Sequence, residues 1–163
     1  MEIRDASAHR FVRLEPVGYQ FPHLRGVEFD SDWLIVSGRA RSDDEEWSFQ
    51  DPVLLVDEAR DVGSWLRAAA GRTAPLLVPG DDGRTWPATQ HIEPNLGLGV
   101  ASYGRDAIVV RVFLRLESAP PSTWSGGGKT DMDFFMDLTT VPEALERAAD
   151  DWDASLAKIP RRS

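Results

Sequence analysis

The chain has 163 residues, 42% of them hydrophobic and 28% charged, and these proportions predict one ordinary globular domain over residues 1–163. Its 27 acidic and 18 basic residues give a net charge of −9, which disfavours nucleic acid as a partner because an acidic surface repels phosphate. The absence of cysteine excludes disulfide scaffolds, thiol enzymes and cysteine-ligated metal centres.

The N-terminal segment gives no targeting signal. Residues 1–10 are polar and aperiodic, so we expect a loose N-terminus there. No basic stretch followed by an apolar core precedes the first predicted strand, and no apolar run approaches the ~20 residues that span a bilayer. These features predict a cytoplasmic protein without a membrane partner.

The first half of the chain predicts a hairpin. Residues 11–15 alternate between apolar and polar side chains, and residues 33–40 are rich in β-branched and aromatic ones, so both predict strands. The tetrad Asp43–Glu46 is expected at the hairpin tip. The returning strand is then expected over residues 47–50, ending at Asp51-Pro52.

A helix is predicted over residues 57–70, because apolar residues recur there at helical spacing. Asp57 is the expected N-cap, and Gly71 the glycine that ends the helix. Three strands are predicted next, and the third has one continuous apolar face from Ile108 to Leu116. Their ranges are 85–92, 96–103 and 107–117.

The last quarter predicts a strand over residues 132–138 and a closing helix over residues 141–158. Thr140-Val-Pro-Glu143 fits the capping-box pattern at the start of that helix. Because strands follow one another through tight connections, the predicted fold class is α+β. It is a mostly antiparallel curved sheet or sandwich of about seven strands with two packed helices.

Three short motifs invite a chemical interpretation. Gly126–Thr130 resembles the end of a phosphate-binding loop, but Thr123 stands where the first glycine belongs, so a flexible loop is favoured. Asp131 and Asp133 offer too few oxygens for a divalent cation. His91 has no nucleophile at a recognisable spacing and is expected to be structural. We therefore predict no cofactor, no metal and no catalytic residue.

The negative charge is concentrated in two zones. Residues 30–61 hold ten acidic and three basic side chains, and residues 131–153 hold eight acidic and one basic, so each zone carries a net charge of −7. The remainder carries +5. Such zones are either solvated faces or electrostatic contact surfaces for a basic partner. The candidate partner-binding acids are Asp43, Asp44, Glu45, Glu46, Glu146, Asp150 and Asp153.

Six tryptophans are many for this length. Trp65 and Trp152 lie on or beside the apolar stripes of the helices and are expected in the core. Trp33 and Trp47 flank the acidic tetrad in sequence. Core packing is the favoured interpretation for these two as well, but one of them is a candidate exposed anchor for a partner.

Several segments together resemble the actinobacterial WapI-like immunity proteins, and the resemblance extends from about Phe11 to Arg162. The segments are Trp33–Gly38, Trp47–Leu55, Val62–Arg67, Ile92–Leu96, Val110–Pro121 and Leu156–Arg162. The family resemblance implies a small cytoplasmic protein that binds and blocks the toxic domain of a contact-dependent toxin, which is a ribonuclease attacking tRNA in the founding case. It carries no functional residue motif onto this sequence.

Two functions are therefore compared. The first is an immunity protein, not an enzyme, that neutralises a basic nuclease-type toxin domain through an acidic surface. The second is a ligand-binding protein or enzyme that uses a sheet face near His91, Arg111 and Arg115.

Overall fold

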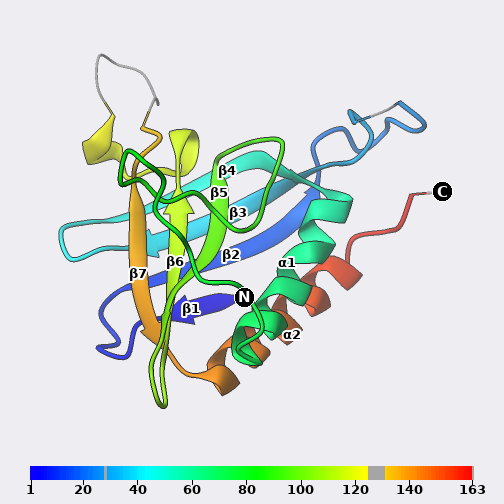
Figure 1. Cartoon of the computed structure of the whole chain (residues 1–163). Helices are drawn as coiled ribbons and strands as arrows, with labels where there is room; N and C mark the ends of the chain where they lie inside the picture. Colours follow the sequence, from blue (N-terminus) through cyan, green and yellow to red (C-terminus); the bar gives the residue numbers. More distant parts are fainter. Residues whose placement is uncertain (28, 125–130, 163) are drawn as a thin grey trace.

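The chain folds into two antiparallel sheets and two α-helices, shown in Figure 1. The computed structural model describes residues 1–27, 29–124 and 131–162, and seven strands lie within them. This confirms the predicted α+β class. The first sheet contains, in spatial order, β1 (Glu2–Arg4), β2 (Phe11–Tyr19), β3 (Trp33–Arg41) and β4 (Glu46–Leu55). The second sheet contains β5 (Leu96–Tyr103), β6 (Ile108–Leu114) and β7 (Phe135–Thr140). The α-helices are α1 (Val56–Ala70) and α2 (Pro142–Ala157), and two 3₁₀ turns are η1 (Leu116–Ser118) and η2 (Pro121–Thr123).

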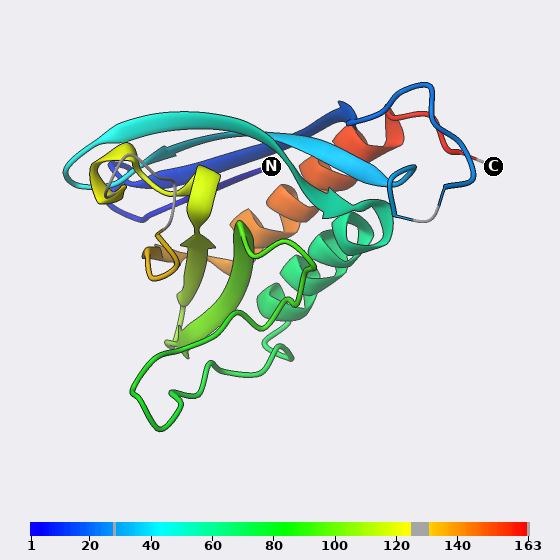
Figure 2. The same ribbon diagram turned by 90° about the horizontal axis from the view of Figure 1, so that it is seen from above.

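The first sheet forms one layer, and the second sheet and the helices lie side by side against it, as Figure 2 shows. The helices pack on each other, with α2 also contacting β1 and β2 and α1 contacting β4. The two sheets meet where β1 approaches β7, since Ala6 N donates to Thr139 O at 2.8 Å. At the other end of the first sheet, β4 contacts η1.

One connected core fills the space between these layers. The alternation predicted for β6 is confirmed, because Ile108, Val110, Val112 and Leu114 are all buried. Trp152 of α2 is fully buried, and its Nε1 donates to Ala59 O of α1 at 2.6 Å. This side chain therefore ties the two helices together at the centre of the core.

The N-terminal segment is not loose as predicted. Residues Glu2–Arg4 form β1, which pairs with β2 in the register Ile3 opposite Val12. Met1 and Ile3 are buried, and Met1 N donates to Leu14 O at 2.9 Å. A three-residue strand offers too few positions for a period-two pattern to appear in the sequence.

The strand predicted over residues 85–92 is also wrong. This stretch is irregular and runs beside β5, with Ala88 N donating to Leu98 O at 2.8 Å. Upstream, Leu77 N bonds to Val100 O. Gly99 leaves room for this close approach, because a Cβ at that position would lie only 2.4 Å from the Leu77 side chain. The loop thus covers the open edge of the second sheet.

Strand β4 runs through the predicted stop at Asp51-Pro52 and ends at Leu55. Pro52 is tolerated because β4 is an edge strand and its register against β3 shifts next to this proline. Sequence patterns mark Pro as a terminator, but they do not tell which strand of the sheet is at the edge.

The helix ends differ from the predicted caps. At α1 the N-cap is Leu55, whose N–H donates to the Glu58 carboxylate at 2.8 Å, so Asp57 lies inside the helix. At α2 the N-cap is Val141, without a side-chain cap, because Thr140 remains paired in β7. Gly71 does end α1, but Arg72 takes the left-handed conformation with φ of 59°.

Candidate functional site: two acidic surfaces

The acidic tetrad lies at the turn between β3 and β4, as predicted, and we call Asp43–Glu46 the acidic tip. Ser42 organises the turn, since its N–H donates to Glu45 O at 2.9 Å. The Ser42 hydroxyl accepts from the N–H groups of Asp44 and Glu45, each at 3.2 Å. The tip is therefore a fixed turn with four carboxylates on it.

Arginines neutralise part of this charge locally. The Glu46 carboxylate accepts from Nε of Arg41 at 2.7 Å and Nε of Arg39 at 2.5 Å, and the hydrogen bond from Arg41 is the main reason that the pKa of Glu46 is lowered. Glu45 accepts from the Ser122 hydroxyl. Asp44 is the one tip carboxylate to which the described residues offer no side-chain partner.

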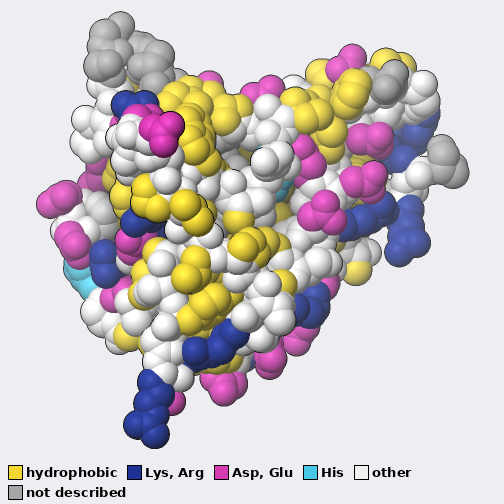
Figure 3. All heavy atoms as spheres, viewed as in Figure 1, with side chains coloured by type: hydrophobic (Ala, Val, Ile, Leu, Met, Phe, Trp, Pro, Cys, Tyr) yellow, Lys and Arg dark blue, Asp and Glu magenta, His cyan; other side chains and the backbone are white. Residues whose placement is uncertain are grey.

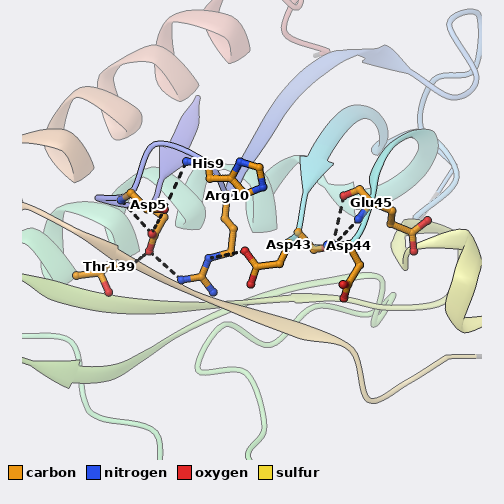
Figure 4. A network of polar contacts seen from close by, with 9 residues as sticks. Asp5, His9, Arg10, Asp43, Asp44, Glu45 and Thr139 are labelled. Carbon is orange, nitrogen blue, oxygen red and sulfur yellow. Dashed lines mark hydrogen bonds and ion pairs between the residues drawn. The ribbon is translucent and has the colours of Figure 1, made fainter.

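A second network of polar contacts connects the tip to the N-terminal segment and β7, as Figure 4 shows. Arg10 lies between two carboxylates: its Nε is 3.8 Å from Asp43 Oδ1, and its Nη2 is 3.2 Å from Asp5 Oδ1. Asp5 is only 7% exposed and also accepts from Thr139 N, at 2.8 Å, and from Ser7. Burial raises the pKa of Asp5, but the hydrogen bonds from Ser7 and Thr139 and the Arg10 charge outweigh it and lower the pKa to about 2.

The second acidic surface lies on α2. Glu143, Glu146, Asp150 and Asp153 recur at spacings of three, four and three, so they share one helix face, and we call them the α2 acidic stripe. Glu143 and Glu146 are exposed, and no described residue forms an ion pair with either. Arg67 of α1 binds the other two, at 2.8 Å to Asp150 and 2.7 Å to Asp153.

A close helix approach makes the Arg67 contacts possible. Gly63 of α1 faces α2, and a Cβ there would lie 2.4 Å from Asp153 Oδ1. A glycine inside a helix costs about 1 kcal/mol relative to alanine. Here Gly63 leaves room for the Asp153 carboxylate. This packing explains why a glycine stands inside the helix, which the helix pattern alone does not.

Neither candidate tryptophan is an exposed anchor at the tip. Trp33 pairs with Leu55 at the far end of the hairpin and is half-buried. Trp47 is 6% exposed, and its Nε1 donates to Ser118 O at 2.9 Å. Its ring also meets Phe134 edge-on, with centroids 5.6 Å apart. The core interpretation therefore holds for Trp47.

The residues of the alternative ligand site do not come together. His91 lines a small cavity with Val112 and Trp152 on the core side of β6. Its Nδ1 is 3.1 Å from Leu96 O, and burial lowers its pKa. Arg111 of β6 and Arg115, which directly follows β6, line a different cavity.

The carboxylate of Asp131 is engaged in a local turn. Asp131 Oδ1 accepts from the backbone N–H of Asp133 and Phe134, at 2.7 and 3.0 Å, which is the bonding of a local turn. Residues 1–27, 29–124 and 131–162 contain no group of three or more His, Asp or Glu side chains placed to hold a metal ion. The phosphate-loop-like segment Gly126–Thr130 lies outside the described residues.

The model of the immunity protein WapI-like family matches residues 3–160, from β1 to just beyond α2. The chain belongs to this family. The match to the WapI-like family confirms the resemblance inferred from sequence segments and includes both acidic surfaces. No curated protein and no solved structure matches the chain.

In this WapI-like protein, neither α1 nor α2, the two helices of the described ranges, is long and apolar enough to span a bilayer. Sequence reasoning found the acids but missed the cations that bind them. Arg41 lies opposite Glu46 in the β3–β4 register. If the turn is assumed to contain the four residues between them, the sequence alone predicts this pair. Arg67 is more than eighty positions from its acids, and no local signal connects them.

Proposed function

We propose that this protein is an immunity protein that binds and neutralises a cognate, basic nuclease-type toxin domain in the cytoplasm. Family membership supports the immunity role. The observation that carries the choice of surface is the α2 acidic stripe, where Glu143 and Glu146 are exposed and unpaired among the described residues. The protein acts by binding rather than by catalysis.

The physical argument concerns which charges remain available to a partner. A nuclease needs a basic groove to hold the phosphates of its substrate, and an acidic inhibitor can approach that groove quickly through long-range attraction. A carboxylate already bound by arginine contributes little to this attraction. Three arginines pair with acids of the tip, whereas Arg67 alone pairs with acids of the stripe among the described residues, so the α2 acidic stripe keeps more net negative charge and is the better contact surface.

The first experiment tests the immunity role itself. The toxin domain encoded upstream of this chain is expressed in cells with and without the protein. We expect growth only when both are present. Cell death despite stable expression of the protein would contradict the immunity role for that pair.

The second experiment tests the surface. We compare the association rate of the toxin domain with wild type and with the double variant Glu143→Lys/Glu146→Lys. The matched control is Asp81→Lys/Asp106→Lys, which changes the net charge equally at exposed positions outside the stripe. We expect the stripe variant to slow association about tenfold more than the control, because it removes charge from the proposed contact surface. The measurement is made at low ionic strength, because at 0.1 M salt the attraction between exposed charges is screened beyond about 10 Å.

The outcome that would remove α2 from the interface is equal slowing by both variants. Asp43→Lys/Asp44→Lys serves as the third arm, and it is expected to slow association less than the stripe variant. If the tip variant has the larger effect, the contact surface is the tip instead.

A further inference from the structure

Arg115 is a buried arginine that forms no ion pair with any described residue. The residue is 5% exposed, and its Nε has no hydrogen-bond partner in the described structure. No ion pair or side-chain hydrogen bond joins its guanidinium to any described residue. Burial accordingly lowers the pKa of Arg115. Leaving a buried charge without an opposite charge is costly, so an unpaired arginine points to a missing anion.

Arg111, which lines the same cavity, shows the contrast. Arg111 binds both carboxylate oxygens of Asp137, each at 2.8 Å, and donates to the Thr85 hydroxyl at 2.8 Å. The Asp133 charge acts on Arg115 from a distance, but the Asp133 carboxylate lies 3.5 Å from Arg84. Both acids are thus already used by other arginines.

Aromatic rings surround the free guanidinium. Cζ of Arg115 lies 4.9 Å from the Phe113 ring centroid and 5.3 Å from that of Trp86. Such cation–π contacts offset part of the burial cost but supply no hydrogen-bond acceptor in the guanidinium plane. The arginine is held in place, and its donors remain available.

A cavity of about 270 Å³ opens onto this group. Arg115 and Arg111 lie in its wall together with Trp86, Met132 and Phe135. Trp86 is 57% exposed and Phe135 42%, so large apolar surfaces stand open at the rim. Figure 3 shows hydrophobic side chains, with Lys and Arg among them, gathered over β6, β7 and the loop before β5.

We propose that this cavity binds a small aromatic monocarboxylate, with its carboxylate on the Arg115 guanidinium and its ring between Trp86 and Phe135. A guanidinium matches a carboxylate through two parallel hydrogen bonds. A monoanion fits better than phosphate because Asp133, in the cavity wall, lies beside Arg84, and Asp137 binds Arg111. The volume is near the lower end for small-molecule sites, about 300 Å³.

This site is independent of the proposed toxin contact. It lies on the outer face of the second sheet, whereas the α2 acidic stripe belongs to the helical side of the molecule. Failure of the one proposal therefore leaves the other standing.

The test is titration of the full chain with phenylacetate, followed by calorimetry and by the nuclear magnetic resonance signal of the Trp86 indole N–H. We expect saturable binding with a dissociation constant of about 1 mM or below. Phenylacetamide, which has the same shape without the charge, is expected to bind at least about tenfold more weakly, and inorganic phosphate likewise.

Two variants locate the site. Arg115→Met is expected to fold, because it replaces an unpaired buried charge with an apolar side chain, and to bind phenylacetate at least about tenfold more weakly. Arg105→Met, at an exposed position in the β5–β6 turn, is the matched control and is expected to bind as wild type. Trp86→Ala, at an exposed position, weakens binding in the same way and decides the matter if Arg115→Met fails to fold.

Three results would each overturn the proposal. These are the absence of saturable phenylacetate binding to wild type, equal binding by Arg115→Met and wild type, and tighter binding of phosphate than of phenylacetate.

Discussion

The acidic tip and the α2 acidic stripe come from two zones with the same net charge of −7. At the tip, arginines of the same hairpin bind Glu46, and Arg10 reaches Asp43. On α2, Arg67 binds half of the stripe, and Glu143 and Glu146 project without an ion-pair partner in the described structure. Equal charge in the sequence therefore becomes unequal charge available at the surface.

The difference does not come from how each surface is anchored. Each is attached to the core by a buried tryptophan that donates its indole N–H to a backbone carbonyl. Trp47 bonds to Ser118 O beneath the hairpin, and Trp152 bonds to Ala59 O beneath α2. The comparison teaches that Asp43 and Glu46 at the tip stabilise a local structure, while Glu143 and Glu146 on α2 form no ion pair with the described residues.

The largest expected loss of stability tests whether Trp47 and Trp152 anchor the two surfaces equally well. Trp152→Ala and Trp47→Ala are each expected to lower the free energy of unfolding by about 3–5 kcal/mol, because each removes a large core side chain and its hydrogen bond. Urea denaturation followed by circular dichroism measures this. The control is Trp86→Ala, 57% exposed, with an expected change within about 0.5 kcal/mol. A loss at Trp47 as small as at Trp86 would mean that the tip is not anchored as described.

The second largest expected loss of stability tests the buried Asp5, which is connected to the tip through Arg10. Asp5→Asn is expected to lower the free energy of unfolding by about 2 kcal/mol at pH 7, since Asp5 accepts hydrogen bonds from Ser7 and Thr139 as a charged group. The pKa of Asp5 falls from 3.8 to about 2 on folding. Its contribution is therefore complete above pH 3.8 and disappears as the pH falls toward 2.

Urea denaturation of Asp5→Asn and wild type across this pH range checks the sign. The gap between the two should narrow steadily on acidification. The comparison variant from α2 is Glu146→Gln, for which we expect almost no gap at pH 7. A gap for Asp5→Asn that stays constant down to pH 3 would show that the loss is steric rather than electrostatic.

The regular elements were predictable where the pattern was long. In both helices and in β6, the apolar residues repeat at the same spacing often enough to distinguish a helix from a strand. The errors fall where tertiary contacts decide. β1 is ordered by pairing with β2, and residues 85–92 remain irregular although they bond to β5. The sequence therefore predicts the fold class and a strand count of seven, but with one wrong strand in place of β1.

The candidate surfaces were predictable only as sets of acids. Glu146 and Asp150 are visible as helix-surface residues, but the charge of a side chain says nothing about which cation lies beside it. Arg67 becomes a partner of Asp153 only because Gly63 lets the two helices approach. The same limit applies to arginines, since Arg111 and Arg115 look equivalent in the sequence pattern, and among the described residues only Arg111 forms an ion pair.

The smallest expected effect tests the comparison at single carboxylates. Glu46→Gln removes the charge that binds Arg39 and Arg41, and the lowered pKa of Glu46 means that its ionised form favours the folded state. We expect a fall in the melting temperature of a few degrees at most at pH 7 and low salt, because partly exposed ion pairs contribute little. The fall should shrink in high salt.

Glu146→Gln is the matched change on α2, with the same loss of one charge and almost no change in shape. Since no described residue pairs with Glu146, its melting temperature should stay at the wild-type value or rise slightly as repulsion along the stripe falls. Differential scanning calorimetry of both variants at two salt concentrations makes the measurement. If Glu146→Gln loses as much stability as Glu46→Gln, the stripe has a structural role after all, and its acids are not free for a partner.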